Sequence, residues 1–264
     1  MNTKIAGILN ITKDSFSDGG EYIDADIAIE KALQLINDGA DIIDIGAEST
    51  HPDSERISSE VEIERIEPVV KALKSKGVKI SIDTYKPEVM EKALELNVDL
   101  INDVTALSDP LSVEVLSGAD VDIIMMFSKN FSPQADKREW ISDDYMGEIT
   151  HFFDDKLENL VQKGFDENRF ILDPGMGFFL GSNAEPSLSV LKRVKRLKTL
   201  GKRIMISTSR KSFIGTVLNR PVSDRDYGTL TTEIYASLQG VDFIRTHNAK
   251  ALSDAIKMIQ AIES

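Results

Sequence analysis

The polar residues best suited to chemistry come directly after, or at the ends of, a series of short apolar runs. Seven of the eight runs end in this way. The polar residues at these ends are Asn10, Glu48, Asp83, Asn102, Asp173, Arg210, Lys211, Arg245 and His247. If the runs are parallel strands of one barrel, their carboxyl ends meet at a single face, which is where catalytic groups gather in such folds. The sequence therefore predicts one site rather than several scattered turns.

These residues divide into a cationic group and a carboxylate–amide group. The cationic group consists of Arg210, Lys211, Arg245 and His247. Guanidinium forks match the oxygens of phosphate, so this group predicts binding of a phosphorylated compound. Asp83, Asn102 and Asp173 offer acceptors and an amide, which suit the alternating donor and acceptor edge of an aminopyrimidine. Asn10 is a candidate ligand for Mg²⁺, which takes few protein oxygens beside phosphate and water.

Each motif also has an ordinary structural interpretation when it is taken singly. Asp173-Pro-Gly175 is typical of a turn, Asn102-Asp103 of a capped strand end, and Arg210-Lys211 of a solvated pair. Phe178-Phe179, by contrast, could close over a flat substrate. The shared placement of the motifs at the ends of successive runs is what favours a function for the set.

The elements that must position these residues follow a recurring pattern. An amphipathic segment ends in Gly or Asn, which tolerate the left-handed backbone angles common after helices, and an apolar run follows. The junctions are Gly39-Ala-Asp41, Gly77-Val-Lys79, Asn97-Val-Asp99, Gly118-Ala-Asp120, Asn168-Arg169, Gly201-Lys-Arg203 and Gly240-Val-Asp242. Helical spacing of apolar residues is clearest over 27–36, 61–73, 145–160, 188–200, 229–238 and 251–262.

Eight strand–helix units in 264 residues predict an α/β fold, either a (β/α)8 TIM barrel or a doubly wound open sheet. Both the number of strands and the chain length favour the barrel. No linker rich in Pro, Gly or Ser divides the chain, so we expect a single domain over residues 1–264. The longest irregular stretch, about residues 128–141, follows the fifth run and is expected to form a mobile loop over the site.

Composition excludes several other classes of protein. The chain has no cysteine, which rules out a disulfide scaffold, a zinc–thiolate site and a cysteine nucleophile. Its formal net charge of −13 argues against general affinity for nucleic acid, which needs clustered Lys and Arg. No apolar run reaches the roughly 18 residues of a membrane span, and the start lacks a secretory segment. We therefore expect a cytoplasmic protein that acts on a small molecule, without nucleic-acid or membrane partners.

Seven segments together resemble the signatures of the dihydropteroate synthase family. They are Gly7-Ile-Leu-Asn-Ile-Thr-Lys-Asp-Ser-Phe-Ser-Asp-Gly-Gly20, Asp44-Ile-Gly-Ala-Glu-Ser-Thr-His-Pro52, Ser81-Ile-Asp-Thr-Tyr85, Ile101-Asn-Asp103, Asp173-Pro-Gly-Met-Gly-Phe178, Ser209-Arg-Lys-Ser212 and Arg245-Thr-His247. They occur in the family's order from residue 4 to about 248. The resemblance implies a TIM barrel that joins 4-aminobenzoate to 6-hydroxymethyl-7,8-dihydropterin diphosphate in folate biosynthesis. It further implies a dissociative mechanism, Mg²⁺ as cofactor and a homodimer formed by helices of the C-terminal half.

The resemblance also implies roles for individual residues. Its catalytic set is Asp83, Lys211, Asn10, Arg245 and His247. Asp83 and Lys211 are implied to bind the pterin. Asn10, Arg245 and His247 are implied to hold the diphosphate, with Mg²⁺ bound at Asn10. The further substrate-binding residues are Asn102, Asp173, Thr50, Pro52, Ser212, Arg210, Phe16, Phe178 and Phe179. Among these, Asn102 and Asp173 complete the pterin site, and Phe16, Thr50, Pro52 and Ser212 form the aminobenzoate pocket.

Several positions depart from the usual family pattern. The loop after Asp173 carries an extra Phe and Gly within Gly177-Phe-Phe-Leu-Gly181, a form that resembles the sulfonamide-resistant branch of the family. Lys13 and His51 replace residues that are usual in the first two loops, and Phe127 replaces a histidine of the pocket wall. Two alternatives remain open on the sequence, namely a noncatalytic pterin-binding paralogue and a pterin-dependent methyltransferase domain.

Overall fold

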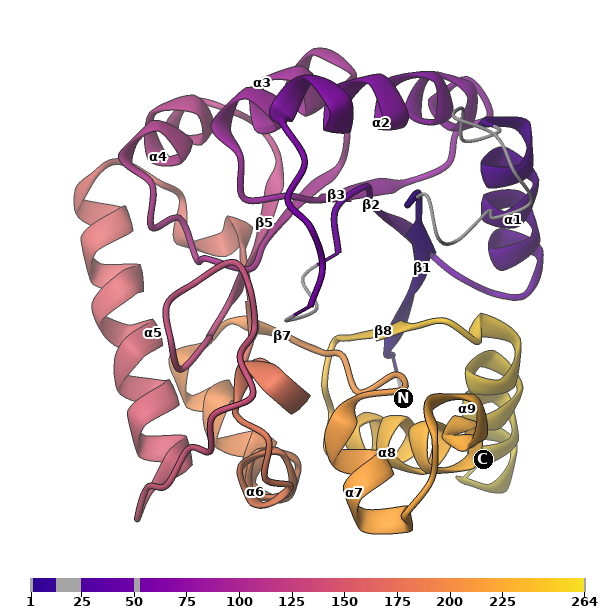
Figure 1. The fold of residues 1–264 in the computed structure, drawn as a ribbon, viewed down its shortest axis with the longest axis vertical. Coiled ribbons are helices and arrows are strands. Elements are labelled where there is room, and N and C mark those ends of the chain that lie inside the picture. The colour runs from indigo at the N-terminus through magenta and orange to yellow at the C-terminus, as the bar shows by residue number, and fades with distance from the viewer. Residues whose placement is uncertain (1, 13–24, 50–52, 264) are drawn as a thin grey trace.

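The alternating segments form a closed barrel of parallel strands in the computed structural model, which describes residues 2–12, 25–49 and 53–263 (Figure 1). The strands are β1 (Lys4–Asn10), β2 (Ile42–Gly46), β3 (Ile80–Asp83), β4 (Leu100–Asp103), β5 (Asp122–Met126), β6 (Phe170–Asp173), β7 (Arg203–Ile206) and β8 (Phe243–Thr246). Each strand pairs with the next, and β8 closes the ring, so Ala6 lies opposite both Ile42 and Arg245. The predicted barrel is confirmed, and the open sheet is excluded.

Helices follow the strands and cover the outside of the barrel. In the described part of the chain they are α1 (Ala25–Asn37), α2 (Ser59–Lys74), α3 (Pro87–Glu95), α4 (Pro110–Ser117), α5 (Tyr145–Gln162), α6 (Glu185–Arg193), α7 (Ser212–Leu218), α8 (Asp226–Leu238) and α9 (Ala249–Glu263). Short 3₁₀ segments are η2 (Glu167–Arg169), η3 (Gly177–Phe179), η4 (Val194–Leu200) and η5 (Val222–Asp224). Ser58, Asp109 and Asp144 cap α2, α4 and α5 by accepting bonds from free backbone N–H groups.

Two features of the helices differ from the sequence-based prediction. The segment 188–200 was predicted as one helix, but α6 ends at Arg193 and continues as η4 up to the left-handed Gly201. The helix α7 was not predicted, because its seven residues are too few to show a clear helical period. Its first residue, Ser212, directly follows the cationic pair, so α7 belongs to the site.

The interior of the barrel changes from apolar to polar along the strands. Every second side chain of a strand faces inward, and near the amino ends these residues form an apolar cluster of Ala6, Ile42, Leu100, Ile124, Ile171, Met205 and Phe243. Two positions further along the even-numbered strands the inward residues are polar, namely Asp44, Asn102, Asp173 and Arg245. Four side chains from alternate strands make one layer of a TIM barrel, so a complete layer is here polar.

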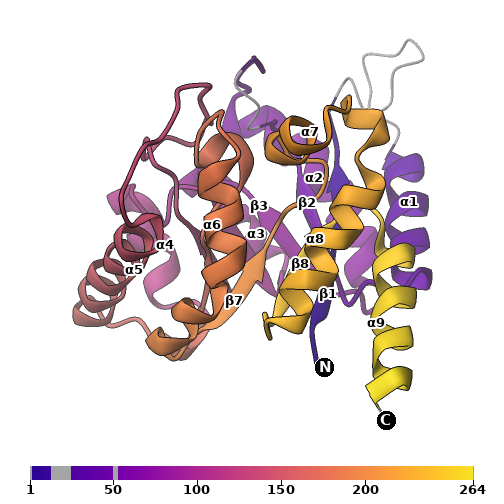
Figure 2. The ribbon, with the colours of Figure 1, turned by 90° about the horizontal axis from the view of Figure 1, so that it is seen from below.

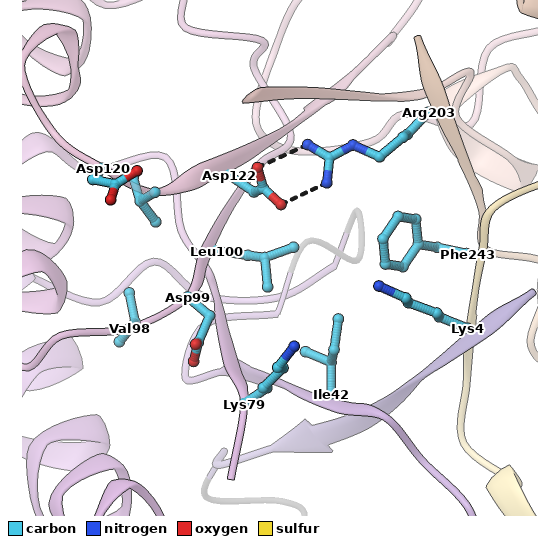
Figure 3. A pocket seen from close by; sticks show the side chains of 11 residues that line it. Lys4, Ile42, Lys79, Val98, Asp99, Leu100, Asp120, Asp122, Arg203 and Phe243 are labelled. Carbon is cyan, nitrogen blue, oxygen red and sulfur yellow. Dashed lines mark hydrogen bonds and ion pairs between the residues drawn. The ribbon is translucent and has the colours of Figure 1, made fainter. Parts of the chain in front are cut away.

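A hollow of about 340 Å³ lies at the amino-terminal end of the barrel, away from this polar layer (Figure 3). Several of its lining residues are the first residues of strands, among them Lys4, Asp122 and Arg203. Arg203 donates two bonds of 2.6 and 2.7 Å to Asp122, which joins β7 to β5 across β6. At this end of a barrel such contacts serve stability rather than catalysis.

The start of β1 and the end of α9 lie at the same end of the barrel (Figure 2). The connections from strands to helices lie at the opposite end, where α7 also begins. Among the described residues, no helix is long and apolar enough to span a membrane.

Candidate functional site

Two residues of the polar layer, Asp44 and Arg245, form an ion-paired group with Asp83, which lies at the end of β3. Arg245 donates from Nε to Oδ2 of Asp44 and from Nη2 to Oδ2 of Asp83, the second over 2.7 Å. Burial opposes the charge of Arg245, but the carboxylates of Asp44 and Asp83 raise its pKa, so it stays a cation. The Oδ1 atom of Asp44 is buried and has no hydrogen-bond partner within the described chain. An unused buried acceptor beside a cation is suited to a ligand that donates hydrogen bonds.

Asp44 is a site residue that the sequence-based prediction missed. It stands inside the run Ile42–Gly46 rather than after it, and it is only 1% exposed. The signal that could have found it is the alternation of side chains along a strand. Ile43 and Ile45 belong to the main core outside the barrel strands, so Asp44 between them must face into the barrel. A charge at an inward position of a buried strand needs a partner, and Arg245 provides it.

Asn102 and Asp173 lie in the same layer, as predicted. Asn102 donates from Nδ2 to Asp44 over 3.4 Å, and Asp173 accepts from the backbone N–H of Gly175 over 2.8 Å. Burial raises the pKa of Asp83 to about 7 and that of Asp173 to about 6, while Arg245 works in the opposite direction. Carboxylates that titrate near neutrality can accept from, or share a proton with, a nitrogen-rich ring.

The turn after Asp173 passes close to Phe127 on one side and to Lys211 on the other. Gly175 has φ +69°, and a Cβ there would lie 2.3 Å from the carbonyl oxygen of Phe127, so glycine is required. Gly177 has φ +65°, and a Cβ there would lie 3.2 Å from Cβ of Lys211. These two close approaches hold the loop against Phe127, directly after β5, and against Lys211, which follows β7.

Phe179 forms the aromatic wall next to Lys211. Nζ of Lys211 lies 5.2 Å from the centre of the Phe179 ring, within the range of a cation–π contact. Burial lowers the pKa of Lys211 to about 8, and Arg245 adds to this effect. Phe179 is buried in a cluster with Val104, Met126 and Ala135, against which Tyr85 and Phe178 pack. The structure thus places Phe179 beside a cation of the predicted site, and Phe178 against the same apolar cluster.

The rest of the predicted cationic group lies around the ends of β7 and β8. His247 shares a hydrogen bond of 2.8 Å between its Nδ1 and Oγ of Ser209. Burial, together with the charge of Arg245, lowers the pKa of His247 to about 3, so the ring is neutral. Arg210 is directed away to the rim, where Nε bonds Asp226 over 3.2 Å. Oγ of Ser212 is buried without a hydrogen-bond partner among the described residues, which leaves it available to a ligand.

Asn10 lies beside the carboxylates at the end of β1. A Cβ built on Gly46 would lie 3.9 Å from Oδ1 of Asn10 and 3.5 Å from Cβ of Asp83. The absence of a side chain at Gly46 therefore keeps the space between Asn10 and Asp83 open. No group of three Asp, Glu, His or Cys residues in the described segments could by itself hold a metal ion. Any Mg²⁺ at Asn10 must then draw most of its ligands from substrate and water.

Glu48, which also follows a strand, takes part in a local ion-pair network. It accepts bonds of 2.6 Å from both Arg56 and Lys86, and Lys86 also pairs with Glu62 over 2.8 Å. These contacts connect the segment after β2 to α2 and to the start of α3, so Glu48 has a structural role. The predicted residues Phe16, Thr50 and Pro52 lie outside the described residues, as do the departures Lys13 and His51.

One expectation about the region after β5 is wrong. Phe127 does not line the pocket, because its ring packs against Trp140 and Phe152 at centroid distances of 5.5 and 5.2 Å. The neighbouring Met126 contributes to the wall with Phe179 instead. The stretch 128–141, which was expected to form a mobile loop over the site, makes many hydrogen bonds, including one from Lys129 N–H to the carbonyl of Phe179 over 3.1 Å.

The fold and this polar layer define the chain as a barrel enzyme that binds a nitrogen-rich ring, and a family model described as pterin binding enzyme matches residues 6–247. Dihydropteroate synthase type-3 of Escherichia coli is 46% identical over 261 residues, covering 98% of this chain and 99% of that protein. The chain belongs to the dihydropteroate synthase family.

Solved structures agree with this assignment. A dihydropteroate synthase of Xanthomonas albilineans with 4-aminobenzoic acid has a TM-score of 0.92 and 31% identity, covering 100% of this chain and 94% of that one. The enzyme of the same organism in complex with 7,8-dihydropteroate has a TM-score of 0.87 and 30% identity, with the same coverage.

Proposed function

We propose that the chain condenses 6-hydroxymethyl-7,8-dihydropterin diphosphate with 4-aminobenzoate, giving 7,8-dihydropteroate and pyrophosphate. The observation that carries this proposal is the buried layer in which Arg245 pairs with Asp44 and Asp83 while one oxygen of Asp44 stays unpaired. A pterin has ring and exocyclic N–H groups that can donate to such carboxylates. The related complexes with 4-aminobenzoic acid and with 7,8-dihydropteroate support the same pair of substrate and product.

In this proposal the protein supplies electrostatics rather than a nucleophile. The bond between the pterin methylene carbon and the diphosphate oxygen breaks first, and the electron pair leaves with the pyrophosphate. Asp83 and Asp44 stabilise the positive charge that develops on the pterin methyl group. The amine of 4-aminobenzoate then attacks this carbon and releases a proton to solvent. Asp173 and Asn102 hold the ring in place, as the resemblance to the family implies.

We assign the diphosphate to the ends of β1, β7 and β8. His247 is neutral and can donate from Nε2, because Nδ1 is engaged with Oγ of Ser209. Among the described residues, Nη1 of Arg245 has no protein acceptor, so it can reach a phosphate oxygen while Nε and Nη2 keep the carboxylates. The amide oxygen of Asn10, beside the open position of Gly46, would be the protein ligand for Mg²⁺. Such an ion would neutralise charge on the departing pyrophosphate.

We further propose that the longer loop with Phe178 and Phe179 lowers sensitivity to sulfonamides. The Phe179 ring is buried against Met126 and Lys211, at the edge of the pterin layer where the second substrate must approach. The planar carboxylate group of 4-aminobenzoate fits beside this ring more easily than the tetrahedral sulfonyl group of a sulfonamide. The selectivity would therefore arise from steric exclusion of the inhibitor.

The function is tested by measuring pyrophosphate release from the pterin diphosphate. We expect release to require 4-aminobenzoate and to fall about 100-fold with excess EDTA, with recovery on adding Mg²⁺. We also expect it to persist at sulfamethoxazole concentrations that stop a relative without the longer loop. Pterin binding without pyrophosphate release would contradict the enzymatic function. Release that the drug stops equally well in both enzymes would contradict only the proposed drug selectivity.

We propose that the chain forms a homodimer through the surface around α7 and α8. Val217, Val222 and Tyr227 are 55%, 54% and 88% exposed, and they lie close together in sequence on α7, η5 and α8. Exposed apolar residues grouped on one surface are typical of protein interfaces. We expect sedimentation equilibrium to give a mass of about 59 kDa, twice the chain mass of 29.3 kDa, and Val222→Lys to shift it toward one chain. A single-chain mass for the unchanged protein would refute the dimer.

A further inference from the structure

The connection between β5 and α5, residues 127–144, is joined along its length to the loop that carries Phe179 (Figure 1). Lys129 N–H donates to the carbonyl of Phe179 over 3.1 Å. Trp140 exchanges two bonds with the side chain of Asn183, of 3.3 Å at its N–H and 3.1 Å at its carbonyl. The β5–α5 loop therefore determines where the aromatic loop can lie.

The β5–α5 loop is itself locked by Asp136. Its carboxylate accepts from Nζ of Lys129 and from Nη2 of Arg138, each over 2.8 Å. It also accepts from Nδ2 of Asn130 over 3.2 Å, and Asn130 bonds the carbonyl of Gln134 over 3.0 Å. Although partial burial opposes it, the bonds from Lys129 and Arg138 lower the pKa of Asp136, so this lock is charged under physiological conditions. Because two charge-assisted bonds from the loop converge on the Asp136 carboxylate, this side chain fixes the conformation of the loop.

The residue next to Asp136 packs against the aromatic wall of the site. Ala135, the residue before Asp136, is 6% exposed and packs in the cluster of Phe179, Met126 and Val104. The Phe179 ring also faces Nζ of Lys211, which lies 5.2 Å from the ring centre. The ring thus contacts both the β5–α5 loop, through Ala135, and a cation of the site.

We propose that Asp136 is a positioning residue that sets the selectivity of the aminobenzoate pocket, because it locks the β5–α5 loop behind Phe179. This inference rests on the proposed function. With the loop locked, the Phe179 ring cannot move away from Lys211 to admit a bulkier acid analogue. With the loop loosened, the Phe179 ring can move away, and the affinity for a sulfonamide increases more than the affinity for 4-aminobenzoate.

The test compares Asp136→Asn with Glu139→Gln, a matched control that also removes one carboxylate. Glu139 is exposed on the same loop and makes no hydrogen bond in the described structure. For Asp136→Asn we expect the ratio of sulfamethoxazole Ki to 4-aminobenzoate KM to fall about tenfold, which is ~1.4 kcal/mol. The KM for the pterin diphosphate is expected to stay unchanged. Glu139→Gln should leave both quantities as they are, and a ratio unchanged in Asp136→Asn would overturn the proposal.

A double-mutant cycle tests whether the effect passes through Phe179. In a Phe179→Ala background, Asp136→Asn should change the selectivity ratio no further, because the ring that it positions is gone. An additive second fall would overturn the proposed route. Asn130→Ala removes the other side of the lock and should repeat the effect of Asp136→Asn.

The chain's single tryptophan gives a readout that does not depend on activity. Trp140 lies in the β5–α5 loop itself, so acrylamide quenching of its fluorescence reports on the lock. We expect quenching to increase in Asp136→Asn and Asn130→Ala but not in Glu139→Gln. Unchanged quenching in both lock variants would overturn the inference even in an active enzyme. A wild-type protein that releases no pyrophosphate would overturn the proposed function. The quenching measurement would still show whether Asp136 and Asn130 hold the β5–α5 loop in place.

Discussion

Replacing Arg245 by methionine is expected to lower kcat/KM for the pterin diphosphate by at least about 1,000-fold, roughly 4 kcal/mol. Two effects act together. The substrate loses a cationic donor, and the carboxylates of Asp44 and Asp83 are left buried without their shared partner. The second effect also destabilises the fold, by about 3–5 kcal/mol in comparable buried pairs. Steady-state kinetics and urea unfolding measure the two losses separately.

Arg245→Lys and a double variant separate charge from geometry. A lysine side chain lacks the planar fork by which Nε and Nη2 of Arg245 reach Asp44 and Asp83 while Nη1 faces the substrate, so Arg245→Lys should recover part of the stability but little of the activity. Arg245→Met combined with Asp44→Asn removes one buried charge of each sign and should regain stability without activity. If Arg245→Met kept more than a tenth of wild-type kcat/KM, the central role given to this ion pair would be wrong.

Replacing Asp173 by asparagine is expected to weaken pterin binding by about 10- to 150-fold, the range of a hydrogen bond to a charged group. The variant can still accept from the N–H of Gly175, so the turn after β6 should persist. Because burial raises the pKa of Asp173 to about 6, its carboxylate is ionised above pH 6 and protonated below. Wild-type affinity should therefore fall as the pH drops through 6.

The pH profile separates the roles of the two carboxylates. Binding of 6-hydroxymethylpterin, measured by calorimetry between pH 5 and 8, should lose its step near pH 6 in Asp173→Asn. The step that belongs to Asp83, near pH 7, should remain. A step near pH 6 of undiminished size in the variant would assign it to another group. Asp224→Asn, an exposed acidic residue on η5, is a control that should leave the profile unchanged.

The barrel was predictable because its signals are local and repeated. Each junction such as Gly39-Ala-Asp41 marks the end of one helix and the start of one strand, and seven such junctions after a first apolar run leave few possible folds. The residues that end strands, such as Asp83 and Asp173, were found for the same reason. The helix α7 was not predicted, because seven residues do not cover enough turns to reveal a period.

The inner parts of the site depend on contacts that a linear pattern does not contain. Asp44 was missed because it stands within its strand, and its importance comes from Arg245, 201 residues away. Phe127 was placed in the pocket wall, whereas strand parity turns it toward Phe152 and leaves Met126 to face the site. The β5–α5 loop has no strand or helix pattern, so the ion pairs that Asp136 makes within it could not be read from the sequence.

The position of the chain ends has a practical consequence for handling the protein. The start of β1 and the end of α9 lie at the end of the barrel remote from the polar layer (Figure 2). A surface or a fused partner attached at either end would therefore face the hollow near Lys4 rather than the substrates. The molecule can be immobilised on a sensor chip through either terminus with the substrate entrance directed into the flowing solution.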